Sequence, residues 1–414
     1  MAADSSKPGV VIIGAGHAGG AAAGLLRQYG YRDAITLIGA EPYLPYQRPP
    51  LSKAWLKGDA SLDDLYLRGE NFYTDQAITA RMNIWSNHIS PSDKTLVLTN
   101  GETLGYDHLV LATGSRPRPF AIKGADRVPH HVLRTLDDAE TLKNALRPGH
   151  HIGLIGAGYI GLEVAASARH LGCQVTLFER ESRILQRVAS AQLSDFFTKT
   201  HADRAVAILT SCTIDELTLG NGDKKVVHLN DGAKHEFDLL LIGIGAMPAD
   251  DLARRAGLEC DNGIVVDDEA HTSDPAIFAI GDVTSRTLPF YKGRFRLESV
   301  PNALEQAKQA AAAITGYRPP MVETPWFWSD QYEFKLQIAG LLQPGARAVA
   351  RGDPATGAFS IFHLDGDNRV RAAECVNRPG DFMAAKLLIA RGVVLDEATV
   401  ADADASLKPF LNPA

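Results

Sequence analysis

Short apolar runs rich in valine, isoleucine and leucine recur along the first two thirds of the chain, separated by amphipathic or small-residue stretches. Continuous runs of this kind are typical of strands buried on both faces of a parallel sheet. GVVIIG at 9–14 and HIGLIG at 151–156 are each followed by a helix-like stretch and a second apolar run. The pattern predicts an α/β fold with two doubly wound, Rossmann-like sheets. Further buried strands are expected at 108–113, 238–245 and 276–282.

The pattern changes near Pro325. The stretches 326–341 and 357–376 read as antiparallel strands, and 381–392 reads as a helix. We therefore expect a third, C-terminal domain of the α+β class. A chain of 414 residues is long enough for two or three domains.

Composition and charge narrow the class of protein. Apolar residues make up 45% and charged residues 22% of a chain with a net charge of -7, which is typical of a globular protein and unfavourable for nucleic-acid binding. No apolar run is long enough to span a bilayer, and the start, MAADSSKPG, lacks the pattern of a secretion signal. We expect a cytoplasmic protein that binds neither membrane nor nucleic acid.

The four cysteines are spread so widely that neither a zinc site nor a redox-active pair is indicated, and no metal site is expected. We interpret each of them as a small buried apolar residue. They are Cys173, Cys212, Cys260 and Cys375.

Each Rossmann-like beginning carries a glycine turn, GAGHAG at 14–19 and GAGYIG at 156–161. In such a turn the first glycine permits the bend from strand to helix, the second admits a pyrophosphate, and the third lets helix and strand pack closely. The phosphates then lie at the positive end of the helix dipole. A lone GxGxxG is weak evidence, but here both lie between a predicted strand and a predicted helix. The glycines are Gly14, Gly16 and Gly19 in the first turn and Gly156, Gly158 and Gly161 in the second.

The residue that ends the second strand of each unit distinguishes the two sites. Glu179 ends QVTLFE, where a carboxylate accepts hydrogen bonds from a ribose and repels a 2′-phosphate, so NADH is favoured over NADPH. Arg180 beside it is the kind of residue that accommodates such a phosphate. In the first unit that position is Gly39; Ala40 offers only backbone, and the nearest acid is Glu41. Two unlike dinucleotide sites predict FAD together with a nicotinamide cofactor.

Several longer motifs, spread along essentially the whole chain, match those of one known family. They are RPPLSKAWL (48–56), LVLATGSRPRP (109–119), LRTLDDA (133–139), GAGYIGLEVAA (156–166), SDPAIFAIGD (273–282), ESVPNALEQA (298–307) and PWFWSDQYEFKLQI (325–338). With them the chain resembles the FAD-dependent NADH:ferredoxin reductases of bacterial oxygenase systems, in particular those that serve haem monooxygenases. The resemblance implies an FAD-binding domain at 1–120 and 247–324, an NAD-binding domain at 121–246, and a C-terminal domain at 325–414 that covers the flavin.

The resemblance also implies FAD contacts. Asp282 would accept a hydrogen bond from the flavin ribityl chain, although a helix-capping aspartate is the alternative. A helix with Pro301 at its first position would direct its positive end and the Val300 amide at the flavin. Lys53, just after a capping Ser52, would lie beside flavin N5; otherwise it is a solvated lysine. The remaining FAD residues implied are Ala18, Pro49, Arg134 and Ser86, the last in NIWSNHIS (83–90), which replaces the family's usual apolar strand.

Glu163 lies two residues beyond Gly161, in the first turns of the predicted helix. An acid there is favoured by the helix dipole alone. In the family, however, this glutamate faces the nicotinamide and pairs with the lysine at Lys53. The other NAD residues implied are Tyr159, Ile160 and Gly245.

Trp328 is the aromatic candidate of the C-terminal domain. By resemblance it reaches the flavin edge, near the surface where an iron–sulfur partner docks, and either shields the flavin or helps electrons leave. Trp326 and Phe327 are expected to be core.

Because no redox cysteines are available, the electrons are expected to pass singly to a [2Fe–2S] ferredoxin. Ferredoxins are usually acidic, so a basic docking patch is required; scattered solvated charges are the alternative. Two other functions stay open: an NADH oxidase or small-molecule reductase, and a flavoprotein whose redox state signals through association. We expect a monomer or weak dimer. The candidate patch residues are Arg294, Arg296, Lys308 and Lys335.

Overall fold

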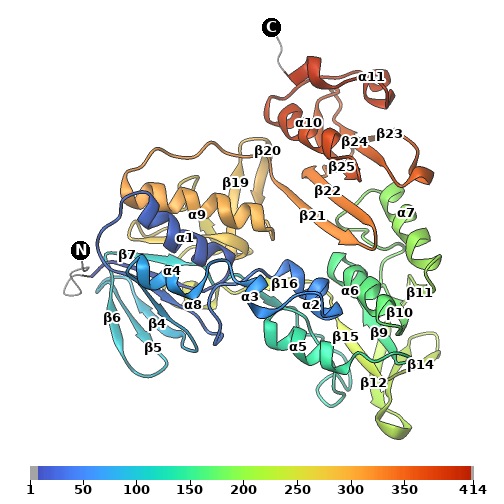
Figure 1. Cartoon of the computed structure of the whole chain (residues 1–414), viewed down its shortest axis with the longest axis horizontal. Helices are drawn as coiled ribbons and strands as arrows, with labels where there is room; N and C mark the ends of the chain where they lie inside the picture. Colours follow the sequence, from blue (N-terminus) through green and yellow to red (C-terminus); the bar gives the residue numbers. More distant parts are fainter. Residues whose placement is uncertain (1–7, 412–414) are drawn as a thin grey trace. The chain divides into compact units, whose positions relative to one another are not determined.

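A computed structural model describes residues 8–411. The chain separates into two compact units, each assembled from three stretches of sequence (Figure 1). Unit 1 runs up to Gln47 and continues in Leu62–Arg116 and Met247–Glu323, whereas unit 2 comprises Arg48–Ser61, Pro117–Ala246 and the chain from Thr324 on. The short strands β8 (Ser115–Pro117) and β16 (Ala246–Pro248) lie at the joins. The division into an interrupted FAD domain, an NAD domain and a C-terminal domain stays a prediction.

Unit 1 is built on a five-stranded parallel sheet in the order β18-β7-β1-β2-β3. The central strand β1 (Val10–Ile13) is buried along its whole length and pairs in parallel with β2 and β7. Its side chains alternate between two cores: Ile12 packs in the layer that holds α1 (His17–Gln28) and α9 (Val300–Thr315), and Ile13 packs on the opposite face. Helices α1 and α9 lie side by side (Figure 1). A strand buried on both faces explains the continuous apolar run.

The other elements of unit 1 complete this frame. They are β2 (Ile35–Ile38), α3 (Leu62–Leu65), α4 (Glu70–Asp75), β3 (Ile78–Arg81), β4 (Ser86–Ser90), β5 (Thr95–Leu98), β6 (Thr103–Gly105), β7 (His108–Leu111), α8 (Asp251–Arg255), β17 (Ile264–Val266), β18 (Ile277–Ala279), η3 (Gly281–Val283), β19 (Thr284–Leu288) and β20 (Tyr291–Phe295).

Unit 2 combines a four-stranded parallel sheet, β11-β10-β9-β15, with a five-stranded antiparallel sheet, β21-β22-β25-β24-β23. One hydrophobic core joins them: Leu154 of β9 and Leu162 of α6 belong to the same buried cluster as Ile338 of β22 and Phe359 of β24. Leu56, from the segment 48–61, also lies in this cluster.

Helix and strand bounds in unit 2 are as follows: η1 (Pro49–Ser52), α2 (Ala54–Lys57), α5 (Leu136–Ala145), β9 (His151–Ile155), α6 (Tyr159–His170), β10 (Gln174–Phe178), α7 (Ala191–Ala202), β11 (Val206–Leu209), β12 (Ile214–Leu219), η2 (Asn221–Asp223), β13 (Lys225–Leu229), β14 (Lys234–Phe237), β15 (Leu239–Ile242), β21 (Trp326–Gln331), β22 (Phe334–Gly340), β23 (Arg347–Arg351), η4 (Pro354–Thr356), β24 (Phe359–Leu364), β25 (Val370–Val376), α10 (Pro379–Ala390), α11 (Glu397–Ala401) and η5 (Lys408–Leu411).

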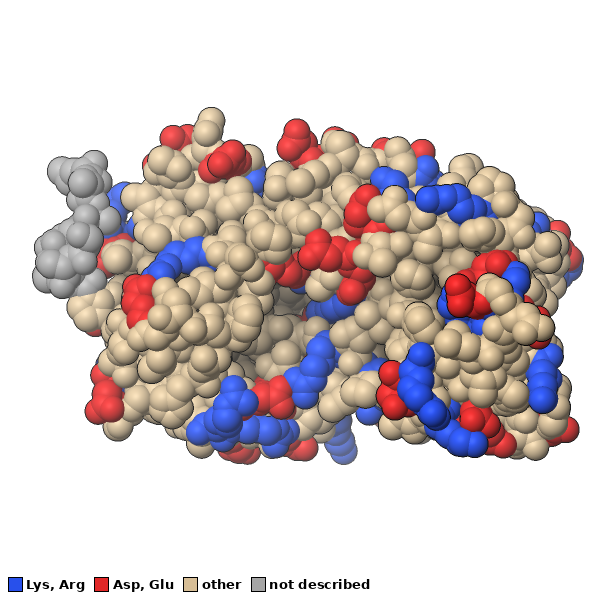
Figure 2. Space-filling view, turned by 90° about the horizontal axis from the view of Figure 1, so that it is seen from below, with Lys and Arg blue, Asp and Glu red and all other residues tan. Residues whose placement is uncertain are grey.

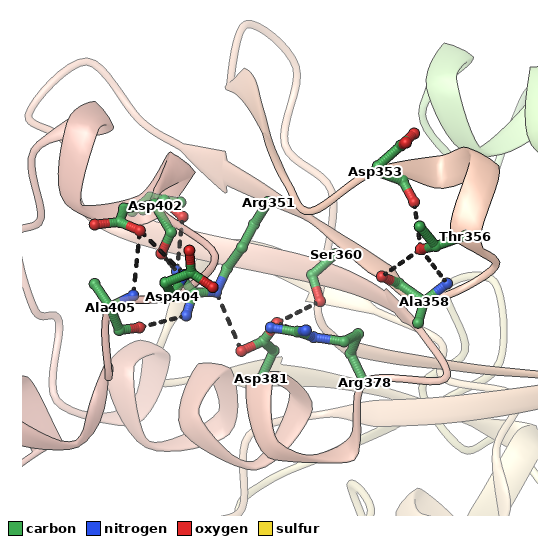
Figure 3. A network of polar contacts seen from close by, with 11 residues as sticks. Arg351, Asp353, Thr356, Ala358, Ser360, Arg378, Asp381, Asp402, Asp404 and Ala405 are labelled. Carbon is green, nitrogen blue, oxygen red and sulfur yellow. Dashed lines mark hydrogen bonds and ion pairs between the residues drawn. The ribbon is translucent and has the colours of Figure 1, made fainter.

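A buried arginine ties the last part of the chain to the antiparallel sheet (Figure 3). Arg351, at the end of β23, is 3% exposed, and its Nε donates to Asp381 Oδ1 at 3.2 Å. Its other nitrogens donate to the backbone carbonyls of Val400, Asp402 and Ala405. One guanidinium thus replaces the missing backbone partners of an irregular segment.

The predicted α/β fold with Rossmann-like parallel sheets is confirmed, and every apolar run quoted above forms a strand. One detail differs: α9 begins at Val300, so Pro301 is its second residue, with the Ser299 hydroxyl accepting from Asn302 N–H as the cap. Within residues 8–411, no helix has both the length and the apolar character that crossing a bilayer requires.

Candidate functional site

The first glycine turn, between β1 and α1, has the backbone geometry that the sequence predicted. Gly14 has φ +114°, and a Cβ there would lie 2.1 Å from the Ala112 carbonyl oxygen. A Cβ on Gly19 would lie 1.9 Å from the Gly14 carbonyl oxygen. At Gly16, by contrast, a Cβ would meet nothing within 4 Å. The turn is therefore closed to side chains where helix and strand meet and open in front of the helix.

The second turn, between β9 and α6, repeats this arrangement. Gly156 has φ +108°, with a Cβ position 2.4 Å from the Gly243 carbonyl oxygen, and a Cβ on Gly161 would lie 2.2 Å from the Gly156 carbonyl oxygen. Gly158 faces open space. Glycine is the N-cap of both helices, so neither helix start carries a capping side chain. Both places are suited to a pyrophosphate at a helix N-terminus.

Glu179 follows β10 directly and lies against the second glycine turn. Its Oε2 accepts the Ala157 N–H at 2.9 Å, and its Oε1 accepts the Glu181 N–H at 2.9 Å. These two amides hold the half-buried carboxylate at the edge of the turn, where the ribose is expected. Arg180 beside it pairs with Glu181 at 3.0 Å on the surface.

The same position after β2 carries no acid. A Cβ on Gly39 would lie 2.8 Å from both Ala15 Cβ and Met82 Sδ, so the chain is tightly packed here. Ala40 is exposed, and Glu41 Oε2 accepts a hydrogen bond from the Tyr46 hydroxyl at 2.5 Å. The two units thus differ at the ribose position, as expected for different nucleotides.

Other FAD candidates gather at the carboxyl edge of the unit 1 sheet. Asp282 lies in η3 just after β18, and its Oδ2 accepts from the Ser115 hydroxyl at 3.2 Å. Val300 opens α9, which packs against η3 and α1, and Ala18 lies in the first turn of α1. Ser86 begins β4; the single hydrogen of its buried hydroxyl is within reach of two acceptors, the carbonyls of His88 and Val97, each at 3.1 Å.

Lys53 and Glu163 form an ion pair in unit 2, although 110 residues separate them. Glu163 Oε2 accepts from Lys53 Nζ at 2.6 Å and from the Ser52 hydroxyl at 2.5 Å. Glu163 is only 3% exposed, whereas the Lys53 side chain is 19% exposed. The segment is fixed further because Ser167 Oγ donates to the Ser52 carbonyl at 2.7 Å. The expectation that Ser52 caps a helix was wrong: Lys53 is the N-cap of α2, without a side-chain bond, and the Ser52 hydroxyl reaches Glu163 instead.

A third donor to this carboxylate comes from the C-terminal sheet. Glu163 Oε1 accepts from the Ser329 hydroxyl at 2.7 Å. Ser329 is adjacent to Trp328 on β21, and Trp328 is partly exposed with its ring 5.6 Å from that of Trp326. Trp326 and Phe327 are half-buried rather than fully buried, because β21 is an edge strand of its sheet.

The structure also places the remaining residues of unit 2 that were predicted to bind FAD or NAD. Pro49 begins η1, and the Arg134 carbonyl accepts from Arg48. Tyr159 and Ile160 open α6; the Tyr159 hydroxyl donates to the Val188 carbonyl at 3.2 Å, and Ile160 is exposed. Gly245 follows β15 with φ +105°. The roles proposed for all these residues toward FAD and NAD stay predictions.

All four cysteines are free thiols, and burial raises the pKa of each above its ordinary value. Cys375 is the extreme case, with its pKa raised to about 12. A raised pKa lowers the fraction of thiolate, which is the nucleophilic form of cysteine.

The candidate docking cations are partly engaged. Arg296 pairs with Glu298, and Lys308 Nζ lies 3.7 Å from Glu323 Oε1, whereas Arg294 and Lys335 are exposed. Figure 2 shows Lys and Arg side chains interspersed with Asp and Glu side chains on the face drawn.

Comparison with known proteins agrees with this geometry. Residues 8–307 match the family described as pyridine nucleotide-disulphide oxidoreductase, and residues 326–411 match the reductase C-terminal family. The chain is 45% identical over 394 residues to a probable ferredoxin reductase, CtmF, of Castellaniella defragrans, covering 95% of this chain and 96% of that one. It is 39% identical to putidaredoxin reductase of Pseudomonas putida, covering 98% and 97%. The chain belongs to the NADH:ferredoxin reductase family.

A solved structure extends the likeness to three dimensions. The reductase in a covalent putidaredoxin reductase–putidaredoxin complex superposes with a TM-score of 0.94 at 38% identity, covering 98% of this chain and 99% of that one. The expected oxidoreductase class and the expected cofactors, FAD and NADH, are confirmed by this membership.

The residues present fit both cofactors. The two open glycine turns would hold the two pyrophosphates, Glu41 and Glu179 are the acids nearest the ribose positions, and Asp282 lies at the same sheet edge as the first turn. Bound FAD supplies an acceptor that takes two electrons as hydride and releases them one at a time. The chain's own contribution would be to orient the nucleotides beside a fixed charge pair, formed by Lys53 and by Glu163 of α6.

Sequence reasoning missed three polar residues that are hydrogen-bonded in series to Glu163: Ser329, Gln331 and His201. Ser329 and Gln331 are two apart on one strand and share a face, and that face is buried. Polar residues at alternate positions among aromatic ones were the available signal.

Proposed function

We propose that this protein takes hydride from NADH onto FAD and passes single electrons to a [2Fe–2S] ferredoxin that serves an oxygenase, with a haem monooxygenase as the terminal enzyme. The observation that carries the proposal is the pair of dinucleotide turns in a chain whose described cysteines are all free thiols, two of them buried and two partly buried. Electrons that enter at the flavin must therefore leave to an outside acceptor. The structural likeness to a reductase solved in a covalent complex with putidaredoxin supports a protein acceptor.

Ferredoxin docking is assigned to the cations Arg294, Arg296, Lys308 and Lys335. Arg294 and Lys335 are the exposed members and are the first to test. Trp328, partly exposed on an edge strand, is assigned to the electron exit. We also propose that the protein works in the cytoplasm as a monomer or weak dimer.

The test is a stopped-flow reduction of the FAD-loaded protein by NADH, followed by cytochrome c reduction with and without acidic [2Fe–2S] ferredoxins. We expect fast flavin reduction and cytochrome c reduction that depends on ferredoxin. The double variant Arg294→Glu/Lys335→Glu should lower the ferredoxin-dependent rate without slowing flavin reduction. The control is Arg347→Glu, which reverses the charge of an exposed arginine that pairs with Glu397. Rapid oxygen consumption without ferredoxin would favour an NADH oxidase. Slow flavin reduction with a long-lived charge-transfer band would favour the signalling flavoprotein.

A further inference from the structure

A chain of buried hydrogen bonds continues from Glu163 beyond Ser329. Gln331 Nε2 lies 3.2 Å from Ser329 Oγ, and Gln331 Oε1 lies 2.9 Å from His201 Nε2 on α7. His201 Nδ1 lies 3.2 Å from the Tyr332 hydroxyl. Ser329, Gln331 and His201 have no exposed surface. The chain reaches the surface only at Tyr332, whose ring stacks under the Arg204 guanidinium at 4.5 Å.

Donor and acceptor chemistry gives this chain a single direction. An ionised carboxylate only accepts, so the Ser329 hydroxyl spends its one hydrogen on Glu163, and the amide nitrogen of Gln331 must donate to Ser329. The Gln331 oxygen then faces His201, whose Nε2 must carry a hydrogen. Burial lowers the pKa of His201 to about 4, so the ring is neutral and its bare Nδ1 accepts from Tyr332. Every donor therefore points toward Glu163, and hydrogen bonds that are aligned in one chain polarise one another.

We infer that Ser329, Gln331 and His201 are positioning residues for hydride transfer, which fix the Glu163 carboxylate in one orientation from the side opposite Lys53. This inference rests on the proposed function. Ser52 and Lys53 bind one carboxylate oxygen and Ser329 binds the other, so the group cannot rotate about its last bond without losing a donor. Hydride transfer is sensitive to small displacements of the groups that orient the nicotinamide, because the ring must be held in a reactive geometry.

A second buried serine-to-carboxylate hydrogen bond in the C-terminal sheet belongs to a different network and provides a matched comparison. Ser360 Oγ, also fully buried in the C-terminal sheet, donates to Asp381 Oδ2 at 3.0 Å. That carboxylate bonds Arg351 and Arg378, far along the chain from either glycine turn. Ser360→Ala is therefore a control that removes a serine-to-carboxylate bond of the same kind.

The experiment measures the limiting rate of flavin reduction by NADH and the long-wavelength charge-transfer absorbance that follows. We expect Ser329→Ala to lower the limiting rate about tenfold and Gln331→Met roughly threefold, in line with loss of hydrogen bonds to or toward a charged group. His201→Phe should resemble Gln331→Met, whereas His201→Gln, which keeps a donor at the Nε2 position, should recover most of the rate. The charge-transfer band should weaken in the same order, and Ser360→Ala should change neither readout.

A double-mutant cycle decides whether the array acts through Glu163. In a Glu163→Ala background, Ser329→Ala should have no further effect on the limiting rate or the charge-transfer band. A full additional loss there, or an unchanged rate in Ser329→Ala itself, would overturn the inference. If Ser329→Ala folds poorly, the same test can be made with Gln331→Met, which should lower the limiting rate, and with His201→Gln, which should keep most of it. Slow flavin reduction in the unmodified protein would instead count against the proposed function.

Discussion

Replacing Glu179 by glutamine should relax the preference for NADH over NADPH. A ribose hydroxyl that donates to the carboxylate lies about 3 Å from it, so a 2′-phosphate in that place brings like charges to about 4 Å. At that distance repulsion is about 1 kcal/mol in water and about 4 kcal/mol at a typical protein surface, and the half-buried Glu179 lies between these limits. We therefore expect the unmodified protein to prefer NADH by roughly 30-fold or more, and Glu179→Gln to reduce the preference about tenfold.

The structure also predicts a side effect of this substitution. Glu179 accepts two backbone N–H groups, those of Ala157 and Glu181, one on each oxygen. A glutamine side chain has only one acceptor oxygen, so one of these amides loses its partner at a cost of about 1–3 kcal/mol. Both coenzymes should then bind more weakly. The ratio of kcat/KM for NADH to that for NADPH cancels this common loss and isolates the charge effect.

Glu181→Gln is the matched control for Glu179→Gln. Glu181 is adjacent in sequence, but its carboxylate bonds the side chains of Arg180 and Gln186 rather than the glycine turn. We expect this variant to keep the coenzyme ratio within about twofold, as for an exposed pair. The assignment would be refuted if Glu179→Gln left the ratio unchanged, or if Glu181→Gln altered it equally.

Two further predictions concern stability, both measured by urea denaturation. Arg351→Met should lower the free energy of unfolding by about 3–5 kcal/mol, because three backbone carbonyls lose their donor and Asp381 keeps only Ser360 and Arg378. Arg347→Met, at an exposed pair with Glu397, should cost less than about 1 kcal/mol. Equal losses would contradict the network in Figure 3. Because burial lowers the pKa of His201 to about 4 while an unfolded histidine titrates near 6.5, its contribution is complete above about pH 6.5 and is lost as the pH falls toward 4. Between pH 7.5 and 5 the unmodified protein should lose about 2 kcal/mol more than His201→Gln, and parallel losses would show that the ring is not buried neutral.

The parts of the fold that sequence predicted are those whose cause is local. The glycine turns were readable because Gly14 and Gly156 need positive φ, and Gly19 and Gly161 admit no Cβ, whatever the rest of the chain does. The buried strands were readable because a strand covered on both faces must be apolar throughout. The hairpins β4–β6 and β12–β14 were not predicted, since short, partly exposed strands carry a weaker pattern.

The charge pair came from family resemblance rather than from local pattern. No spacing rule brings Lys53 to Glu163, because the two residues are 110 positions apart in the sequence. Ser52 shows the opposite error: a serine before a helix is a good cap by local rules, yet its hydroxyl forms a tertiary bond with Glu163. A buried carboxylate competes well for a donor, since leaving it under-bonded is costly.

The Glu163 carboxylate is the point where the three stretches of unit 2 meet. Ser52 and Lys53 come from the first stretch, Glu163 from the second, and Ser329 from the third. A chain without the C-terminal sheet would leave one oxygen of this buried group without its donor. The hydrophobic core of unit 2 is likewise built from all three stretches, since Leu56, Leu162 and Ile338 pack in one cluster. The C-terminal sheet is therefore part of the structure that holds Glu163, the acid that we propose faces the nicotinamide, and substitutions in β21 should affect electron entry as well as electron exit.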